Sequence, residues 1–256
     1  MSAGLQELPP GKDAVRLMFD ELAWEYVKSR ERQASFLAQK RIVLDMLSGL
    51  RGRLLEAGCG PATMFAHFLA CGFEEVHGID VSPEMIRQGE QRLAQHPLAE
   101  RCALRVADLE KLPYADGTFD VVVVMGVLEY LSGYRAALAE IRRVLRRGGH
   151  VILTVPNQAS AYHLARSSYR NARRLLRVRR GEAVSARPCM PWLLNRELAA
   201  AGMEKVASSA CNFIFFGLKE LSERVSAAVD SRLEPLSRTP LAPLLGAQYV
   251  VKAIRR

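Results

Sequence analysis

The chain has 256 residues, of which 49% are hydrophobic and 25% are charged. This length suits one large α/β domain better than two independent cores, and the composition excludes collagen-like, coiled-coil and wholly disordered chains. Lysine and arginine number 36 against 27 acidic residues, a formal net charge of +9 that can favour nucleic acid, an anionic membrane surface or an acidic substrate.

The sequence lacks the patterns of a membrane span, a signal peptide and a metal site. No apolar run approaches the ~18 to 20 residues that a membrane-spanning helix needs, and residues 1–12 do not read as a signal peptide. The five cysteines are widely spaced and form no C-x-x-C pair, so neither a disulfide framework nor a zinc site is indicated. We therefore expect a cytoplasmic protein without a bound metal.

Helical and strand-like patterns follow one another along the chain. Residues 13–50 form a long helical region, after which apolar runs alternate with amphipathic stretches, as in a parallel sheet with helical crossovers. The predicted strands are Arg53–Ala57, Glu75–Asp80, Cys102–Ala107, Phe119–Met125, His150–Val155, Val206–Phe216 and Gln248–Ile254. The predicted helices are Ala62–Cys71, Pro83–His96, Tyr134–Arg147 and Pro191–Ala201, with Gly148 and Gly202 just past two helix ends.

Two insertions interrupt the later part of the chain, at about residues 157–190 and 217–246. The first contains eight arginines against one acid, Glu182, so most of the positive charge is local. Additions to a rigid scaffold usually carry specificity. We therefore expect the insertions to select the substrate.

A glycine turn follows the first predicted strand. Gly58 and Gly60 lie between this strand and the next helix, where the lack of a side chain lets a ligand approach the backbone closely. A dinucleotide fingerprint would have a third glycine at the position of Thr63, and Pro61 changes the turn further. The turn therefore predicts a small ligand and disfavours NAD.

Acidic residues stand at or just beyond the ends of the first three predicted strands. Glu56 could orient donors around a zwitterionic amino-acid ligand, whereas it would repel a pyrophosphate. Asp80 could accept hydrogen bonds from both hydroxyls of a ribose, or it could cap the following helix, as Ser82 could equally well. Asp108 follows the third strand and could be a simple turn residue.

The run Glu56-x-Gly58-x-Gly60-x-Ala62 resembles motif I of the class I S-adenosylmethionine-dependent methyltransferases, usually written D/E-x-G-x-G-x-G, with Ala62 in place of the last glycine. Further segments resemble the later motifs of the same family, in order. They are Val106–Pro113, Asp116–Val123 and Leu138–Gly149. Over residues 53–155 the chain is similar to the small-molecule methyltransferases that include ubiquinone and menaquinone biosynthesis enzymes.

This resemblance implies a Rossmann-like, doubly wound sheet of seven strands in the order 3-2-1-4-5-7-6, with the last strand antiparallel, N-terminal helices, and helical insertions after strands five and six. It implies S-adenosylmethionine as the cofactor and S-adenosylhomocysteine as its product. We expect one methyltransferase domain over residues 1–256. Its parts would be an N-terminal helical cap (13–50), a cofactor-binding core (51–156), a basic insertion or lid (157–190) and a C-terminal part of the sheet (191–256).

The resemblance also implies which residues bind the cofactor. Asp80 would bind the ribose and Asp108 the adenine amino group, while the backbone of Met125 would border the cofactor. The segment Phe19–Tyr26 resembles the family's Y-D-x-x-A-x-x-Y opening, although these residues could equally form an ordinary amphipathic helix. The full set expected at the cofactor is Phe19, Arg30, Glu56, Ala57, Gly58, Cys59, Gly60, Asp80, Val81, Asp108, Leu109 and Met125.

A catalytic base is not required by this chemistry. A sulfonium methyl group is already activated, so transfer needs mainly a positioned acceptor and exclusion of water. Many relatives have a histidine where Tyr130 stands, so a ready base or metal ligand is missing here. Glu129 and Tyr130 could contact substrate, or be a helix-start acid and a packed tyrosine. His163, on the first insertion, is a further candidate base.

Residues 162–180 form a basic amphipathic pattern, with tyrosines, alanines and a leucine on one stripe and arginines on the next. Such a helix can lie on an anionic membrane, recognise a phosphorylated substrate or form a solvated lid. We predict methyl transfer to a small-molecule or lipid-like acceptor by direct displacement in a shielded cleft, at a membrane surface in one interpretation. The alternatives are a nucleic-acid methyltransferase, although base-amino and catalytic-cysteine motifs are missing, and a catalytically degenerate cofactor-binding scaffold.

Overall fold

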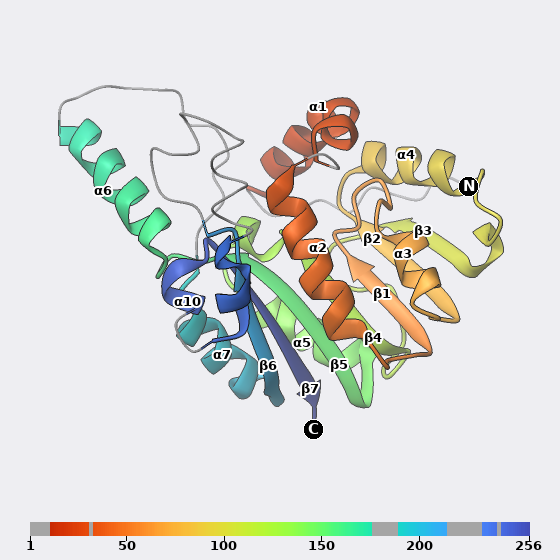
Figure 1. Ribbon diagram of the computed structural model, residues 1–256. Coiled ribbons are helices and arrows are strands. Elements are labelled where there is room, and N and C mark those ends of the chain that lie inside the picture. The colour runs from red at the N-terminus through yellow and green to blue at the C-terminus, as the bar shows by residue number, and fades with distance from the viewer. Residues whose placement is uncertain (1–10, 31–32, 176–188, 214–231, 240–241) are drawn as a thin grey trace.

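The computed structural model describes residues 11–30, 33–175, 189–213, 232–239 and 242–256. Its centre is a seven-stranded sheet in the order β3-β2-β1-β4-β5-β7-β6 (Figure 1). β7 runs antiparallel to both of its neighbours, and the other pairs are parallel. The strands are β1 (Arg53–Ala57), β2 (Glu75–Asp80), β3 (Cys102–Val106), β4 (Phe119–Met125), β5 (Leu145–Pro156), β6 (Met203–Cys211) and β7 (Gln248–Arg255). The predicted strand order and the antiparallel last strand are confirmed.

Helices cover both faces of the sheet. Figure 1 shows α2 in front of the sheet and α5 behind it, and two buried clusters correspond to these layers, one with α2, α3 and α4 and the other with α5 and α7. The helices are α1 (Lys12–Arg30), α2 (Ala34–Leu47), α3 (Phe65–Ala70), α4 (Pro83–Leu93), α5 (Arg135–Val144), α6 (Ala161–Leu175), α7 (Pro191–Ala200) and α10 (Ala242–Leu245). Short 3-10 helices are η1 (Ala99–Arg101), η2 (Leu128–Tyr130) and η3 (Glu234–Arg238).

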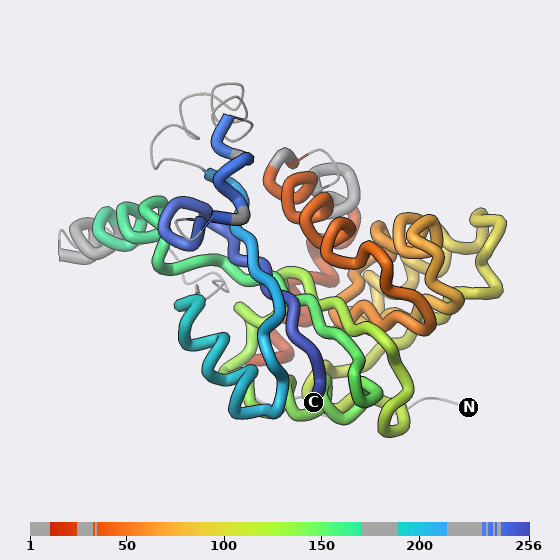
Figure 2. Tube along the Cα trace, turned by 60° about the horizontal axis from the view of Figure 1, so that its bottom comes forward, coloured from red at the N-terminus to blue at the C-terminus, as the bar shows by residue number. Residues whose placement is uncertain are grey.

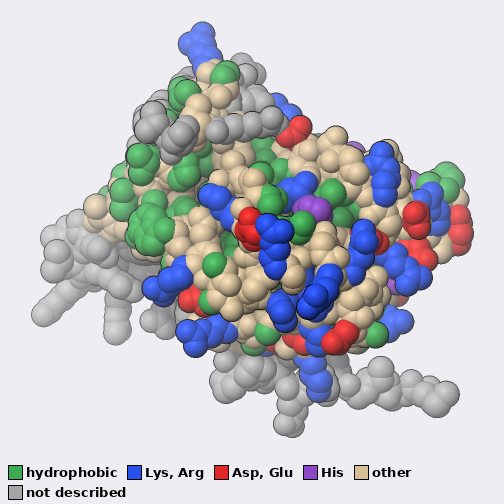
Figure 3. Space-filling model, turned by 90° about the horizontal axis from the view of Figure 1, so that it is seen from below, with side chains coloured by type: hydrophobic (Ala, Val, Ile, Leu, Met, Phe, Trp, Pro, Cys, Tyr) green, Lys and Arg blue, Asp and Glu red, His purple; other side chains and the backbone are tan. Residues whose placement is uncertain are grey.

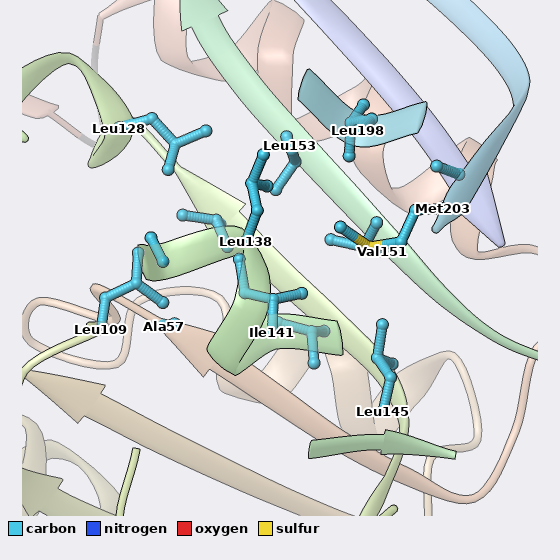
Figure 4. Packing of buried hydrophobic residues seen from close by; sticks show 14 of the residues in the cluster. Ala57, Leu109, Leu128, Leu138, Ile141, Leu145, Val151, Leu153, Leu198 and Met203 are labelled. Carbon is cyan, nitrogen blue, oxygen red and sulfur yellow. The ribbon is translucent and has the colours of Figure 1, made fainter. Parts of the chain in front are cut away.

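The central strand β4 is one apolar run because both of its faces are buried. Val122 and Val124 are buried in the cluster on the α5 side, while Val121 and Val123 are buried in the cluster on the α2 side. Because both faces of a parallel sheet are covered, alternation of polar and apolar residues is lost. Figure 4 shows the α5-side cluster, in which Leu138 of α5 and other side chains from β5 and α7 gather.

Several element boundaries differ from the predictions. The long helical region splits into α1 and α2, and α3 begins only at Phe65 because the backbone first turns through Ala62, whose φ is 55°. α5 ends at Val144, not Arg147, since Leu145 already pairs with Phe119 as the first residue of β5. Gly148 therefore lies inside a strand and does not end a helix.

The strand predicted at Val206–Phe216 is displaced toward the N-terminus. β6 begins at Met203 and ends at Cys211, because Asn212 adopts a left-handed conformation with φ of 60°. Residues 214–216 lie outside the described residues. In Figure 2, β6 and β7 run side by side along their length, in agreement with their antiparallel register.

Positively charged side chains are not confined to the first insertion. Figure 3, seen from below, shows Lys and Arg side chains over much of this face among fewer acidic ones, with hydrophobic side chains gathered on the left. On α6, Arg166 is exposed, while residues 176–188 of the same insertion lie outside the described residues. In the part of the chain that is described, no helix is long and apolar enough to cross a membrane.

Candidate cofactor site

A cavity lies at the carboxyl ends of β1, β2 and β4, where ligands bind in open α/β sheets. Its empty volume, including space open to solvent, is about 750 Å³. α1 supplies one wall, through Lys12, Val15 and Phe19, although it is far in sequence from the strand ends. The site is therefore assembled from the glycine turn, the loops after β2, β3 and β4, and the N-terminal helix.

The glycine turn requires glycine at its first position. Gly58 has a φ of +81°, and a Cβ atom there would lie 2.1 Å from Cγ2 of Val127, which also lines the cavity. The N–H groups of Gly58 and Cys59 both donate to the carbonyl of Ile79, at 2.7 and 2.9 Å. The turn is thereby fastened to β2, and its backbone faces the cavity without a side chain in the way.

Asp80 joins the turn to the next helix. Its Oδ2 accepts a hydrogen bond from the N–H of Gly60 at 2.8 Å, and its Oδ1 accepts one from the N–H of Ser82 at 3.0 Å. Ser82, not Asp80, caps α4, because Ser82 Oγ accepts from the N–H of Met85 at 3.1 Å. Each carboxylate oxygen can accept a second hydrogen bond, so Asp80 keeps acceptor capacity toward the cavity that it lines.

Burial changes the acidity of two groups at the turn. It raises the pKa of Asp80, against the lowering effect of the backbone N–H donors and with a further raising contribution from Asp20. Burial, together with Asp80 and Glu56, also raises the pKa of the Cys59 thiol well above its usual range. Cys59 is therefore a protonated, buried thiol, which is a poor nucleophile.

Asp108 lines the cavity from the loop after β3. Its Oδ1 accepts from the N–H of Glu110 at 2.9 Å, and its Oδ2 accepts from Nζ of Lys12 at 2.5 Å. Lys12 also forms an ion pair with Glu110. Burial by itself lowers the pKa of Lys12, but hydrogen bonds to Asp108 and Glu110 raise it above its ordinary value.

α1 is connected to two further parts of the site. The ring of Phe19 packs edge-on against Tyr130 of η2, with centroids 5.3 Å apart, and both residues line the cavity. Oδ1 of Asp20 accepts a hydrogen bond from Oγ of Ser82 at 2.5 Å. Phe19 therefore belongs to a helix, as the amphipathic pattern predicts, and its side chain also lines the cavity. The side chain of Arg30, also expected at the cofactor, lies outside the described residues.

The structure brings most of the expected cofactor residues together. Those that line the cavity are Phe19, Gly58, Gly60, Asp80, Val81, Asp108, Leu109 and Met125. Glu56, Ala57 and Cys59 are buried beside it, in β1 and the turn, and are not part of its lining.

The three candidate catalytic residues are placed differently from one another. Tyr130 lines the cavity, whereas Glu129 is buried and is not part of the lining. His163 is buried on α6, where its ring contacts that of Tyr162 at 5.1 Å, and it does not line the cavity either. The roles of all three remain predictions.

Sequence reasoning missed several lining residues, among them Lys12, Val15, Met85, Val127 and Leu131. Lys12 is separated from its partner Asp108 by 96 positions, so no local pattern connects them. Val127 and Leu131 lie in the segment after β4, which ends at Met125. Their position beyond a strand end is the sequence signal that points to them, because ligands bind at the carboxyl ends of strands in open α/β sheets.

Comparison with known proteins identifies a methyltransferase domain within part of the chain. Residues 55–153 match the family model described as "Methyltransferase domain" (Methyltransf_11). The chain carries a class I methyltransferase domain. This methyltransferase domain is 32% identical over 153 residues to malonyl-[acyl-carrier protein] O-methyltransferase from Salmonella typhimurium, covering 58% of the chain and 56% of that relative.

A second relative is demethylmenaquinone methyltransferase from Alkalihalophilus pseudofirmus, 36% identical over 84 residues, which are 33% of the chain and 35% of the relative. The chain thus spans about half of the first relative and about a third of the second. Among solved structures, magnesium protoporphyrin IX methyltransferase from Synechocystis, with bound S-adenosylhomocysteine, superposes with a TM-score of 0.66 at 16% identity, covering 96% of this chain and 100% of that one. This likeness shows the shared fold.

The residues of the site fit S-adenosylmethionine, the cofactor of this class. Gly58 leaves the backbone of the turn open, where any Cβ would collide with Val127. Asp80 keeps carboxylate acceptor capacity at the end of β2 for a pair of ribose hydroxyls. Asp108 presents a second carboxylate on the loop after β3, one strand farther along the sheet. The methyltransferase domain therefore has its polar groups in the order that a nucleoside lying across these strands requires.

Proposed function

We propose that this methyltransferase transfers a methyl group from S-adenosylmethionine to a small-molecule or lipid-like acceptor, by direct displacement in a shielded cleft. The observation that carries the proposal is the lining of one cavity by residues of opposite character. Asp80 ends β2 and Asp108 follows β3, while Tyr130 and Leu131 follow β4 on the other side of β1. The acidic side suits a nucleoside, and the apolar side suits the body of an acceptor.

The protein's contribution to the reaction would be positioning and exclusion of water. When bound, the cofactor supplies a methyl group on a positively charged sulfur, which needs no further activation. Phe19 and Tyr130 close one side of the cavity by their edge-to-face contact, which keeps water from the reacting atoms. Tyr130 is also the candidate that could hold a hydroxyl or amine of the acceptor, because its side chain lines the cavity.

The names of the relatives are consistent with this acceptor class. The second relative is named as a demethylmenaquinone methyltransferase. Malonyl-[acyl-carrier protein], named for the first, is a small acyl group on a carrier. We infer that the acceptor of this chain likewise carries its reacting group on a larger body, part of which would lie against the apolar side of the cavity.

The test of the proposed function is calorimetric titration with S-adenosylhomocysteine, with NADH as a parallel control. We expect micromolar binding of the first and none of the second. Asp80→Ala should weaken binding by about 1 to 3 kcal/mol, because it removes the acceptor of two ribose hydroxyls. Binding of NADH alone would overturn the cofactor assignment, and unchanged affinity of Asp80→Ala would show that this acid has been given the wrong role.

Acceptors would then be screened by measuring S-adenosylhomocysteine release with quinones, sterols, acyl thioesters and RNA. We expect release with at least one lipophilic or acyl acceptor and none with RNA. Release with RNA alone would replace the proposed acceptor class by nucleic acid. Cofactor binding without release with any of these compounds would favour a scaffold protein that binds the cofactor without using it.

We further propose that the enzyme works at the cytoplasmic face of an anionic membrane, to which α6 binds. On α6 the predicted apolar stripe is exposed at Ala165 and Tyr169, and Leu164 is 52% exposed beside Arg166. α7 and α10, on the same side of the molecule in Figure 1, expose Trp192 and Leu244. Figure 3 shows hydrophobic side chains gathered on this side. Apolar side chains beside arginine suit an anionic lipid surface.

The membrane proposal is tested by sedimentation with vesicles of phosphatidylglycerol and phosphatidylcholine. Replacing Leu164 and Tyr169 together by serine should reduce the fraction bound by about tenfold or more, because two exposed apolar side chains are lost. The control is Val206→Ser, which removes a half-exposed apolar side chain on β6. Vesicles without anionic lipid should bind weakly. Equal sedimentation of the double variant and the control would remove the proposal.

A further inference from the structure

Lys12 makes a shielded ion pair across the cavity wall. Its Nζ lies 2.5 Å from Oδ2 of Asp108 and also contacts Oε2 of Glu110. The lysine side chain is 16% exposed, and each of the two carboxylate side chains is 19% exposed. Salt screens partly buried pairs much less than exposed ones, so this contact holds the start of α1 more firmly than a surface ion pair would.

Lys12 and Asp108 both line the cavity. The carboxylate of Asp108 already accepts from the N–H of Glu110 through Oδ1 and from Lys12 through Oδ2. An oxygen of a carboxylate can accept two hydrogen bonds, and an ammonium has three donors. Asp108 can therefore accept a hydrogen bond from an amino group of a ligand while it keeps its ion pair with Lys12. The ammonium of Lys12 also offsets the negative charges of Asp108 and Glu110.

α1 is attached to the rest of the site at three points. Lys12 reaches the loop after β3, Asp20 accepts from Ser82 at the start of α4, and Phe19 packs on Tyr130 after β4. These points belong to three separate segments around the cavity. α1 thus forms one wall of the cavity and is held there at three points. Of these three contacts, only that of Lys12 joins two full charges. Its loss should therefore weaken the attachment of α1 most.

We propose that Lys12 is a positioning residue of the cofactor site, whose ion pair with Asp108 and Glu110 closes α1 over the bound cofactor and sets how long the cofactor stays. The inference rests on the proposed function, since it takes S-adenosylmethionine as the ligand. It assigns Lys12 to retention of the cofactor. Opening of α1 would then be the step that admits the cofactor and releases S-adenosylhomocysteine.

The experiment is stopped-flow measurement of S-adenosylhomocysteine association and dissociation with Lys12→Met. We expect dissociation to be about tenfold faster or more, and association to be faster as well, because both pass through the open position of α1. The equilibrium affinity should change much less than either rate. Lys12→Arg should restore most of the slow dissociation, because a guanidinium also pairs with both carboxylates.

A matched control is Lys111→Met. Lys111 is exposed on the same loop as Asp108, so this variant makes the same change of charge and side chain close to the site without touching the ion pair. Its rates should equal those of the wild type. If Lys12→Met does not fold, Glu110→Gln provides the second variant. It removes one of the two carboxylates that Lys12 contacts, and we expect a smaller acceleration of dissociation.

Hydrogen exchange gives a readout that does not need the ligand. The amides of residues 13–24 should exchange faster in Lys12→Met than in the wild type, and those of β4 should not change. If the wild type binds S-adenosylhomocysteine but Lys12→Met dissociates at the rate of Lys111→Met, with unchanged exchange in α1, the role of Lys12 is overturned and the proposed function stands. If the wild type does not bind the ligand, the proposed function fails, and cofactor retention by Lys12 fails with it.

Discussion

The two halves of the sheet hold their ligand-facing ends in different ways. In the half formed by β3, β2, β1 and β4, a glycine turn is fastened to β2 by the N–H groups of Gly58 and Cys59 on the carbonyl of Ile79, and by Asp80, which accepts from Gly60. In the half formed by β5, β7 and β6, backbone hydrogen bonds such as that from the N–H of Asn157 to the carbonyl of Ala247 are joined by a buried side chain. Nδ2 of Asn157 donates to the carbonyls of Pro243 at 2.5 Å and Gly246 at 2.8 Å.

The two halves also differ in how far the family model covers them. The family model ends at residue 153, just before Asn157 and the insertion that contains α6. A backbone-built turn tolerates few sequences, because its geometry depends on φ angles that side chains forbid. A side-chain connection can be moved or replaced during evolution with little change to the sheet. The first arrangement suits an invariant cofactor, and the second suits an acceptor that differs between enzymes.

The largest effect is expected at Gly58. Gly58→Ala adds a Cβ atom 2.1 Å from Val127 Cγ2 on a backbone with φ of +81°, so it should lower the free energy of unfolding by about 3 kcal/mol or more. Gly148→Ala is the matched control, because Gly148 has a φ of +74° with nothing within 4 Å, and should cost about 1 kcal/mol. Urea unfolding measures both. Equal losses would mean that the turn relaxes away from Val127.

A smaller effect is expected at Asn157, which is fully buried. Asn157→Ala leaves the carbonyls of Pro243 and Gly246 without their donor, which should lower the free energy of unfolding by about 1 to 3 kcal/mol. Affinity for S-adenosylhomocysteine should stay close to the wild-type value, because the cofactor half is untouched. Gln158→Ala, at a partly exposed neighbouring position, is the control. A large loss of cofactor affinity in Asn157→Ala would show that the two halves are coupled.

The pH dependence of cofactor binding should report on Asp80. In the proposed site, ribose hydroxyls would donate to the ionised carboxylate of Asp80, and burial raises the pKa of this group. Affinity should therefore fall as the pH drops through that raised pKa, and Asp80→Asn should show no such slope. The stability of the free protein should depend on pH in the opposite sense to the affinity. Its native state holds this proton more tightly than the unfolded state, so the contribution of Asp80 to stability is lost as the pH rises through the native pKa.

Calorimetric titrations with S-adenosylhomocysteine between pH 4 and pH 8, roughly the range around a carboxyl pKa that burial has raised, measure the slope. A profile for the wild type that matches Asp80→Asn throughout would assign the ribose to another group.

The smallest effect is expected at Ala62, which stands where the family motif has its last glycine and adopts a φ of 55°. Ala62→Gly should raise the free energy of unfolding by about 0.5 kcal/mol, because relief of the left-handed conformation exceeds the loss of chain entropy and of one buried methyl group. Ala139→Gly, at an exposed position within α5, should have the opposite sign, with a loss of about 0.5 to 1 kcal/mol. A loss at both positions would mean that the left-handed alanine is not strained.

Much of the candidate cofactor site could be predicted from the sequence because its residues stand at or just beyond the ends of strands. Asp80 is the last residue of β2 and Asp108 comes two residues after β3, and the carboxyl ends of parallel strands meet at one edge of the sheet. The sequence could not say whether Asp80 or Ser82 caps α4. The hydrogen bond from the N–H of Met85 to Ser82 Oγ shows that Ser82 is the cap. Boundaries were less predictable where pairing between distant strands overrides helical propensity, as at Leu145.

The sequence alone determined the fold class, the strand order implied by the resemblance, and the glycine turn with the acids that follow its neighbouring strands. These features are local, or depend on the regular alternation of strands and helices, so they can be recognised without coordinates. Only the tertiary structure decided that α1 lies against the cavity, that Lys12 reaches Asp108 across 96 positions, and that the stripe of α6 with Tyr169 is exposed. Contacts between remote segments depend on how the layers pack, which no periodicity in the chain records.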